Sequence, residues 1–213
     1  MQDALDALFV YLRGDGSEHP PVLVEAAWVH YQLEAIHPFI GGNGRVGRVL
    51  IPLPIAQRRR LDHPLLYLSP YFRQNRTLYN DLLFAVSAQS QWERWLRFFL
   101  EAVVARARAA IELSDRLIAL GNQWHEALNE RRAARNAHRL ADYVHQHIPV
   151  SARTAEHHLD VRPPTAYSAS RALEEPRILV EATGRARDRI WVAPALMRLL
   201  VNKSAPSDRG SAP

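Results

Sequence analysis

The segment that most restricts the fold of this chain runs from His37 to Arg48. A glycine-rich stretch, Gly42-Asn43-Gly44, separates an apolar run before it from a basic, apolar-patterned run after it. Glycines adopt backbone angles that other residues avoid, so successive N–H groups of this stretch can converge on an anion. The pattern after Gly44 predicts a helix whose positive end points at the same anion. The segment therefore predicts a helix that begins at an anion-binding loop.

Charged and titratable side chains flank this loop. Arg45 and Arg48 are three residues apart and share one face of the predicted helix, where two guanidiniums suit two phosphates. The side chain of His37 can accept a proton near neutral pH, and Pro38 biases His37 toward an extended backbone. Each feature alone is typical of an ordinary turn or a solvated helix face. Their joint spacing favours a phosphate site beside a general base.

A known family shares this pattern. The string His37-Pro38-Phe39-Ile40-Gly41-Gly42-Asn43-Gly44-Arg45-Val46-Gly47-Arg48 resembles the signature of the Fic (filamentation induced by cAMP) family, His-x-Phe-x-Asp/Glu-Gly-Asn-Gly-Arg-x-x-Arg. The segments 27–36, 65–81 and 92–100 are similar to helices of that family, and the likeness covers roughly residues 1–125. The resemblance implies a helical enzyme that transfers AMP from ATP to a hydroxyl group of a target protein.

The resemblance also implies roles for single residues. His37 would take the proton from the attacking Tyr, Thr or Ser hydroxyl. The loop from Gly42 to Gly44 would hold the α- and β-phosphates, with Asn43 orienting the phosphates and the loop. Arg45 would support the diphosphate leaving group, and Arg48 would reach the terminal phosphate. This chemistry fits the residues, because attack at phosphorus needs a positioned hydroxyl, charge neutralisation and little else.

Gly41 departs from the family signature. Family members carry at this position an acid that coordinates the Mg²⁺ bridging the phosphates. Glycine offers no side-chain ligand, so we expect no metal ligand from the protein at Gly41 and Mg²⁺ held weakly through the phosphates of ATP. Two outcomes are open: a transferase with a reduced rate, or a nucleotide-binding relative that barely turns over.

Two further features follow from the resemblance. Tyr71 and Tyr79 are candidates for lining the nucleotide base, although a tyrosine on an amphipathic helix is more often a core residue.

Many family members carry a flap and a regulatory helix with a Ser/Thr-x-x-x-Glu motif, and residues 1–30 show no such motif. We therefore expect either a fragment or late-started product, or target docking and inhibition that come from elsewhere.

Composition excludes several classes of protein. With 213 residues, of which 47% are hydrophobic, the chain can hold one large domain, or one domain plus a small one. It has no apolar run of about 18 residues and no basic-then-apolar leader, which argues against membrane insertion and secretion. Zero cysteines exclude disulfides and fit a cytoplasmic protein. The pairs His145/His147 and His157/His158 lack a convincing ligand set for a metal.

Residues 114–135 predict a long connecting helix, and from Asn136 the pattern takes the order of a winged helix. Helices are predicted over 137–146, over 151–159 with Ser151 as N-cap, and from 163 to about 173 with proline in the first turn. Two short β-branched runs, 179–182 and 189–193, are joined by a basic turn. The segment resembles the winged-helix modules often appended to Fic proteins. The predicted division is 1–125, 126–203 and a disordered tail over 204–213.

The net charge of +5 lies mainly in this second part. Residues 126–213 carry 14 basic and 10 acidic residues, against 13 and 12 in residues 1–125, which favours contact with nucleic acid. Glu174 and Glu175 weaken that interpretation, and a module that binds protein or the Fic-like domain is the alternative. The candidate DNA contacts are Tyr167, Ser168, Ser170, Arg171, Arg185, Arg187 and Arg189.

The sequence therefore predicts a mainly α fold, with a helical Fic-type domain followed by a small winged helix-turn-helix (α+β) domain. The predicted function is AMP transfer from ATP. The alternatives are a weakly active or inactive nucleotide-binding protein that regulates through DNA, and transfer of another phosphate-linked group. The expected partners are ATP, an unidentified target protein and DNA, with no membrane and with a homodimer left open.

Overall fold

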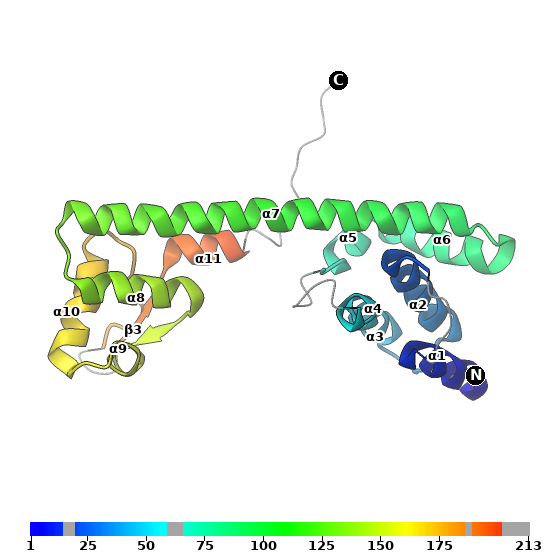
Figure 1. The fold of residues 1–213 in the computed structure, drawn as a ribbon, viewed down its shortest axis with the longest axis horizontal. Helices are drawn as coiled ribbons and strands as arrows, with labels where there is room; N and C mark the ends of the chain where they lie inside the picture. The colour runs from blue at the N-terminus through cyan, green and yellow to red at the C-terminus, as the bar shows by residue number, and fades with distance from the viewer. Residues whose placement is uncertain (15–19, 59–65, 186–188, 202–213) are drawn as a thin grey trace, which may run out of the picture. The chain divides into compact units, whose positions relative to one another are not determined.

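The computed structural model describes residues 1–14, 20–58, 66–185 and 189–201. The chain forms two compact units, residues 1–110 and 111–213. Helices make up most of each unit (Figure 1), and the second unit adds a small sheet, so the predicted mainly α fold is confirmed. The boundary falls within the long helix α7 (Trp92–Glu130), and the division predicted after residue 125 lies further along the same helix.

The first unit is helical throughout its regular structure. Two of the segments that resemble family helices, 27–36 and 92–100, lie within observed helices. Ahead of α7, its described helices are α1 (Gln2–Arg13), α2 (Val22–Ile36), α3 (Asn43–Leu50), α4 (Pro52–Gln57), α5 (Ser69–Gln74) and α6 (Arg76–Gln89).

An aromatic core joins α2, α5, α6 and α7. Trp95 and Phe99 of α7 are fully buried, and Phe72 of α5 stacks on Phe98 with 5.8 Å between ring centroids. The indole N–H of Trp95 donates to the carbonyl oxygen of Ala27 in α2 at 3.2 Å, so the polar atom of this large core residue is satisfied. These contacts anchor α2 and thereby fix the point in space where the loop after it begins.

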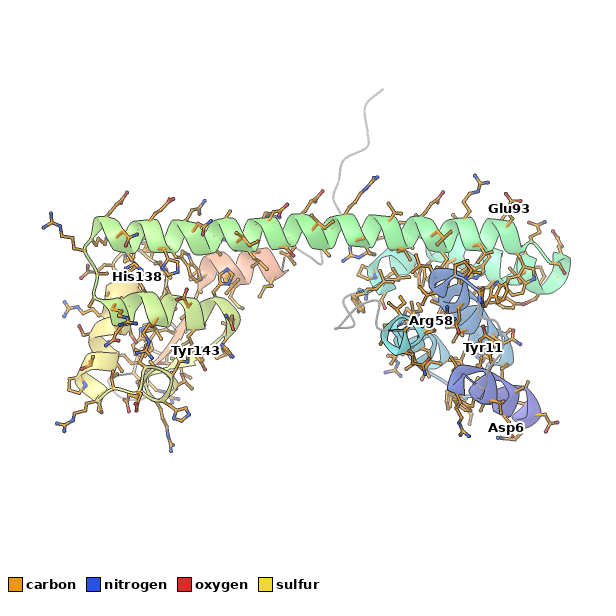
Figure 2. The ribbon with its side chains drawn as sticks, viewed as in Figure 1. Asp6, Tyr11, Arg58, Glu93, His138 and Tyr143 are labelled. Atoms are coloured by element: carbon orange, nitrogen blue, oxygen red, sulfur yellow. The ribbon has the colours of Figure 1, made fainter. Side chains whose placement is uncertain are left out.

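Smaller contacts hold α1 and α4 against α2. Leu8 and Leu12 of α1 belong to one apolar cluster with Leu33 of α2. Arg58, which follows α4 and is labelled in Figure 2, forms an ion pair with the buried carboxylate of Glu25 in α2. The helices that precede the loop between α2 and α3 in the sequence, and α4 that follows it, therefore pack together and hold the two ends of the loop.

Two prolines, Pro52 and Pro54, follow the helix that begins at the loop. α3 ends at Leu50 and α4 begins at Pro52, with the buried side chain of Ile51 between them. Proline lacks the backbone N–H that a continuing helix needs, but it is favoured in the first turn of a new one. α3 is therefore a short helix that begins at the glycine loop and ends before Pro52.

The second unit combines helices with a small antiparallel sheet. The strand order is β1-β3-β2, with Val150 opposite Trp191 and Val180 opposite Val192. The three predicted helices and both predicted short runs are observed, whereas β1 and α11 were not predicted. Its elements after α7 are α8 (Arg135–Gln146), β1 (Val150–Ser151), α9 (Ala152–Leu159), α10 (Pro163–Glu174), β2 (Val180–Glu181), β3 (Ile190–Val192) and α11 (Pro194–Val201).

Ser151 caps α9, as predicted. Its hydroxyl accepts the N–H of Thr154 at 3.1 Å, and the hydroxyl of Thr154 accepts the N–H of Ser151 at 2.8 Å. This reciprocal pair is a capping box in which threonine takes the usual place of an acid or amide. The cap fixes where the chain turns from β1 into α9.

Two predictions concern the ends and the environment of the chain. Among the helices of the described residues, none is both long and apolar enough to cross a membrane. The tail predicted over 204–213 lies outside the described residues.

Candidate active site

The loop between α2 and α3 begins at His37, which closes α2 in a left-handed conformation. His37 has φ 50° and ψ 53°, and its N–H donates to the carbonyl oxygen of Leu33 at 3.0 Å. The extended backbone predicted for His37 is therefore wrong. Pro38 disfavours the right-handed helical region for the residue before it, and a left-handed cap avoids that region while still closing the helix. Such a conformation is uncommon outside glycine and is enriched at functional sites.

One contact orients the exposed imidazole of His37. Its Nδ1 lies 3.4 Å from the carbonyl oxygen of Glu34. Because a carbonyl oxygen only accepts, Nδ1 carries the proton in this contact. In the neutral ring Nε2 then keeps its lone pair. This is the tautomer that a general base needs if Nε2 is to take a proton from a substrate.

Asn43 is buried and holds the loop closed. Its Oδ1 accepts the N–H of Phe39 at 2.8 Å, and its Nδ2 donates to the carbonyl oxygen of Phe39 at 2.6 Å. Both ends of the side-chain amide are thus engaged with the loop backbone. Asn43 shapes the loop, and any effect it has on a bound phosphate passes through that shape.

Gly42 turns the loop into α3. It has φ 91°, a value that glycine adopts freely, and its carbonyl oxygen accepts the N–H groups of Arg45 and Val46 at 2.9 and 3.1 Å. No side chain caps α3. The N–H groups of Asn43 and Gly44 in its first turn have no acceptor within the helix, so they are available to an anion at its positive end.

The two motif guanidiniums lie close to the loop glycines. A Cβ atom added at Gly42 would lie 3.3 Å from Nη2 of Arg45, and one added at Gly44 would lie 2.9 Å from Nη1 of Arg48. A side chain at either position would therefore displace a guanidinium. The glycines keep both cations beside the first turn of α3, an arrangement suited to a polyphosphate.

A polar cavity of about 360 Å³ adjoins Arg48. Besides Arg48 it contains two further guanidiniums and one carboxyl group, a composition suited to a chain of phosphates. α2, α3, α5 and α6 all contribute residues to it. The cavity is lined by Glu34, Gly44, Arg48, Ser69, Phe72, Arg73, Arg76, Tyr79 and Asn80.

Two hydrogen-bonded side chains lie beside Glu34 at this cavity. Nε2 of His30 and the hydroxyl of Tyr79 are 2.9 Å apart, and Tyr79 and Glu34 both line the cavity. Burial lowers the pKa of His30 to about 4, so this histidine is neutral at physiological pH. Burial also raises the pKa of Tyr79 and that of Glu34.

The two tyrosines proposed for the nucleotide base occupy packed positions. Tyr79 is buried and stacks on Phe72 with 5.0 Å between ring centroids. Tyr71 is half-buried, packs against Phe98 at 5.5 Å and does not line the cavity beside Arg48. Stacking on a base needs an open ring face. These positions favour the core role over base stacking for both tyrosines.

Gly41 lies in open space. A Cβ atom added there would meet nothing within 4 Å, so an acidic side chain would fit at this position without a collision. Across the described ranges, no group of three or more His, Cys, Asp or Glu side chains is placed to hold a metal ion. The residues present fit a divalent cation at this loop only if the ligand itself supplies most of the oxygen donors.

The candidate DNA contacts on α10 divide between surface and core. Tyr167, Ser168 and Arg171 are exposed. Ser170 is fully buried, and its hydroxyl donates to the carbonyl oxygen of Ala166 at 3.1 Å. This placement corrects the assignment of Ser170 as a DNA contact, because a buried hydroxyl bonded within its own helix cannot reach a base edge.

The segment between β2 and β3 carries the other candidates. The guanidinium of Arg189 lies 5.2 Å from the ring centroid of Tyr167, and its Nε donates to the carbonyl oxygen of Arg185 at 3.0 Å. Arg185 is exposed, and Arg187 lies outside the described residues. The structure thus brings Arg189 and Tyr167 together.

Sequence reasoning missed four residues beside the loop: His30, Glu34, Arg73 and Arg76. His30, Glu34 and His37 are spaced by four and three residues, the spacing of one helix face, and that signal was available in the sequence. Arg73 and Arg76 carry no such signal, because they reach the cavity from α5 and α6 through tertiary packing.

The loop and the helices around it are similar to known proteins. Residues 1–54 match the family model of the Fic/DOC family. A crystal structure of a Fic family protein from Desulfovibrio desulfuricans G20 is also similar, at 19% sequence identity and a TM-score of 0.47. The alignment covers 90% of this chain and 54% of that one, so this chain spans about half the length of that protein. The Fic/DOC match includes the whole segment from His37 to Arg48.

Proposed function

We propose that the first unit is a nucleotidyltransferase that moves AMP from ATP to a Tyr, Thr or Ser hydroxyl of a target protein. One observation carries this proposal: His37, oriented through Nδ1, begins a loop that ends in free helix amides and two guanidiniums. The match of residues 1–54 to the Fic/DOC family supports it. A base and a phosphate site so close in the chain suit attack at phosphorus.

In the proposed reaction the target hydroxyl attacks the α-phosphorus of ATP. Its proton passes to Nε2 of His37 as the new oxygen–phosphorus bond forms, and the bond to the pyrophosphate oxygen breaks. Pyrophosphate leaves, and AMP remains on the target. The loop amides, Arg45 and Arg48 stabilise the negative charge on the phosphates during the step.

Labelled ATP tests the transfer. Wild-type protein and His37→Ala are incubated with ATP labelled at the α-phosphate and with candidate target proteins. Label is expected in a target with the wild type alone. ATP labelled at the γ-phosphate serves as a control that separates AMP transfer from phosphorylation. Equal labelling by wild type and His37→Ala would contradict the catalytic role.

Magnesium is proposed to bind through the phosphates of ATP, where it supplies neutralisation of their charge. Gly41→Asp adds a carboxylate ligand where the structure leaves room for one. We expect this substitution to raise the rate of AMP transfer and its dependence on Mg²⁺. If neither changes, the missing acid does not limit the reaction.

We also propose that the second unit is a winged helix that binds DNA. The supporting observation is the order α8, β1, α9, α10, β2, β3, with exposed Tyr167, Ser168 and Arg171 on α10. Binding is measured by the fluorescence anisotropy of a labelled DNA duplex at several salt concentrations. Affinity that weakens with salt is expected. No binding at low salt would favour a protein partner instead.

A further inference from the structure

Glu34 places a carboxyl group against the helix that begins the anion site. It stands one turn before His37 on α2 and lines the same cavity as Arg48. A Cβ atom added at Gly47 would lie 2.6 Å from Oε1 of Glu34, and one added at Gly44 would lie 3.5 Å from it. The carboxyl group therefore touches the first turns of α3, whose amides are the proposed phosphate contacts.

One oxygen of this carboxyl group is buried and has no hydrogen-bond partner among the described residues. Oε1 of Glu34 is that atom. Tyr79 lines the same cavity as Glu34, and the charges of Arg48 and His37 act on the carboxyl group. A protonated carboxyl group would turn an acceptor into a donor. The surroundings of Glu34 therefore suit both protonation states: the nearby positive charges favour the carboxylate, and the buried oxygen without a partner favours the protonated acid.

The charged and titratable groups around Glu34 determine when it changes state. Burial raises the pKa of Glu34, and the nearby positive charges oppose that effect. A phosphate bound in the cavity would neutralise those charges and place a second anion beside the carboxylate. The groups that face it are His30 and His37 from α2, Arg48 from α3, Arg73 from α5, and Arg76 and Tyr79 from α6.

We propose that Glu34 is a positioning residue that couples nucleotide binding to proton uptake. As a carboxylate it attracts Arg48 in the empty cavity, and it takes up one proton when a nucleotide phosphate binds beside Arg48. The proton removes the repulsion between the two anions and offers the phosphate a hydrogen-bond donor. This inference rests on the proposed nucleotide binding of the first unit.

The direction of the pH dependence follows from linkage. The pKa of Glu34 is higher in the nucleotide-bound state than in the empty state. ATP affinity therefore rises as the pH falls through the bound-state pKa, and it levels off below the empty-state pKa. Between the two values the expected change is about tenfold in affinity per pH unit.

Calorimetric titration of the full chain with ATP tests the coupling. Measuring the binding heat in two buffers of different ionisation enthalpy gives the number of protons taken up. Because histidines titrate near neutrality, the comparison is made without the ring of His37. His37→Ala is expected to take up about one proton more than His37→Ala/Glu34→Gln, by the linkage just described. The terminal phosphate of ATP titrates in both and cancels.

A matched control and a second measurement complete the test. Glu93→Gln removes an exposed carboxylate on α7 (Figure 2) and is expected to leave proton uptake unchanged. Equal proton uptake with and without Glu34 would overturn the inference and leave nucleotide binding intact. No ATP binding by the wild type would overturn the proposed function and the inference together. Should Glu34→Gln not fold, carbon-13 NMR of the Glu34 carboxyl must show its pKa rising on ATP addition, and an unchanged pKa would overturn the inference.

Discussion

The two units present their basic residues in different ways. In the first unit Arg48 lines a polar cavity, and its guanidinium lies beside the backbone of Gly44. In the second unit Arg171 is exposed on α10, and Arg189 lies over the ring of Tyr167. Partly enclosed cations act at short range in one geometry, whereas exposed cations act through charge that salt screens. Substitutions should therefore have large, geometry-dependent effects in the first unit and small, salt-dependent effects in the second.

Histidines show the same contrast. In the first unit His30 is buried, which lowers its pKa to about 4 and keeps it neutral. In the second unit the Nδ1 atoms of His125 in α7 and His138 in α8 are 2.9 Å apart in stacked rings, and Nε2 of His125 donates to Asp142 at 2.8 Å (His138 is labelled in Figure 2). One Nδ1 must donate and the other must accept. The hydrogen bond between the two rings therefore exists only when one of the two Nδ1 atoms carries no proton.

The largest effect is expected at His37. His37→Ala should lower the rate of AMP transfer by about 10²–10⁴-fold, because proton transfer by a positioned base contributes that much. The ATP dissociation constant should change little. Rates and binding are measured separately, and His157→Ala, an exposed histidine of α9, serves as the control. A loss of ATP binding as large as the loss of rate would make His37 a binding residue.

The next largest effect is expected where α3 packs on α2. Gly47→Ala would bring a Cβ atom within 2.6 Å of Oε1 of Glu34 and 3.1 Å of Nδ1 of His30. Crowding of this kind lowers the free energy of unfolding by about 1–3 kcal/mol. Urea unfolding measures the change, with Gly41→Ala as a control in open space that should stay within about 0.5 kcal/mol. Equal free energies of unfolding for Gly47→Ala and Gly41→Ala would mean that α2 and α3 can move apart enough to accept the added methyl group.

A smaller effect is expected at the cap of α9. Ser151→Ala removes the hydroxyl that accepts the N–H of Thr154 and should lower the free energy of unfolding of the second unit by about 1 kcal/mol. Thermal unfolding followed by circular dichroism measures it. Ser168→Ala removes an exposed hydroxyl of α10 and should change stability by less than half as much. If Ser151→Ala leaves the stability of the second unit unchanged, the sheet alone sets the start of α9.

The smallest effect is expected on the surface of α10. Arg171→Ala should weaken DNA binding a few-fold and reduce the slope of log affinity against log salt by about 0.9, the value for one phosphate contact. Anisotropy titrations over a salt series give both numbers. Arg97→Ala, an exposed arginine of the first unit, is the matched control. A large loss at a single salt concentration with no change of slope would indicate a base contact.

Local features of the fold were predictable because neighbouring residues decide them. The loop glycines, the prolines after α3 and the cap at Ser151 all act on the backbone within a few residues. The conformation of His37 was not predicted, because the restriction from Pro38 and the closing of α2 compete at one residue and the helix cap prevails. The sequence also did not show which face of α10 is buried, because small residues such as Ser170 occur on both buried and exposed helix faces.

The amino-acid sequence by itself determined the glycine loop, the proposed base His37 and the two guanidiniums of Arg45 and Arg48, because these lie within one short stretch of chain. Only the tertiary structure decided which side chains from other parts of the chain lie beside them. His30 and Tyr79 are 49 residues apart in the sequence, yet they share a hydrogen bond next to Glu34. Such contacts form only when several helices pack around one core, and packing of distant segments leaves no trace in local spacing. The motif carries the proposed base and phosphate contacts, and the packing of the helices places Glu34 and Tyr79 beside them.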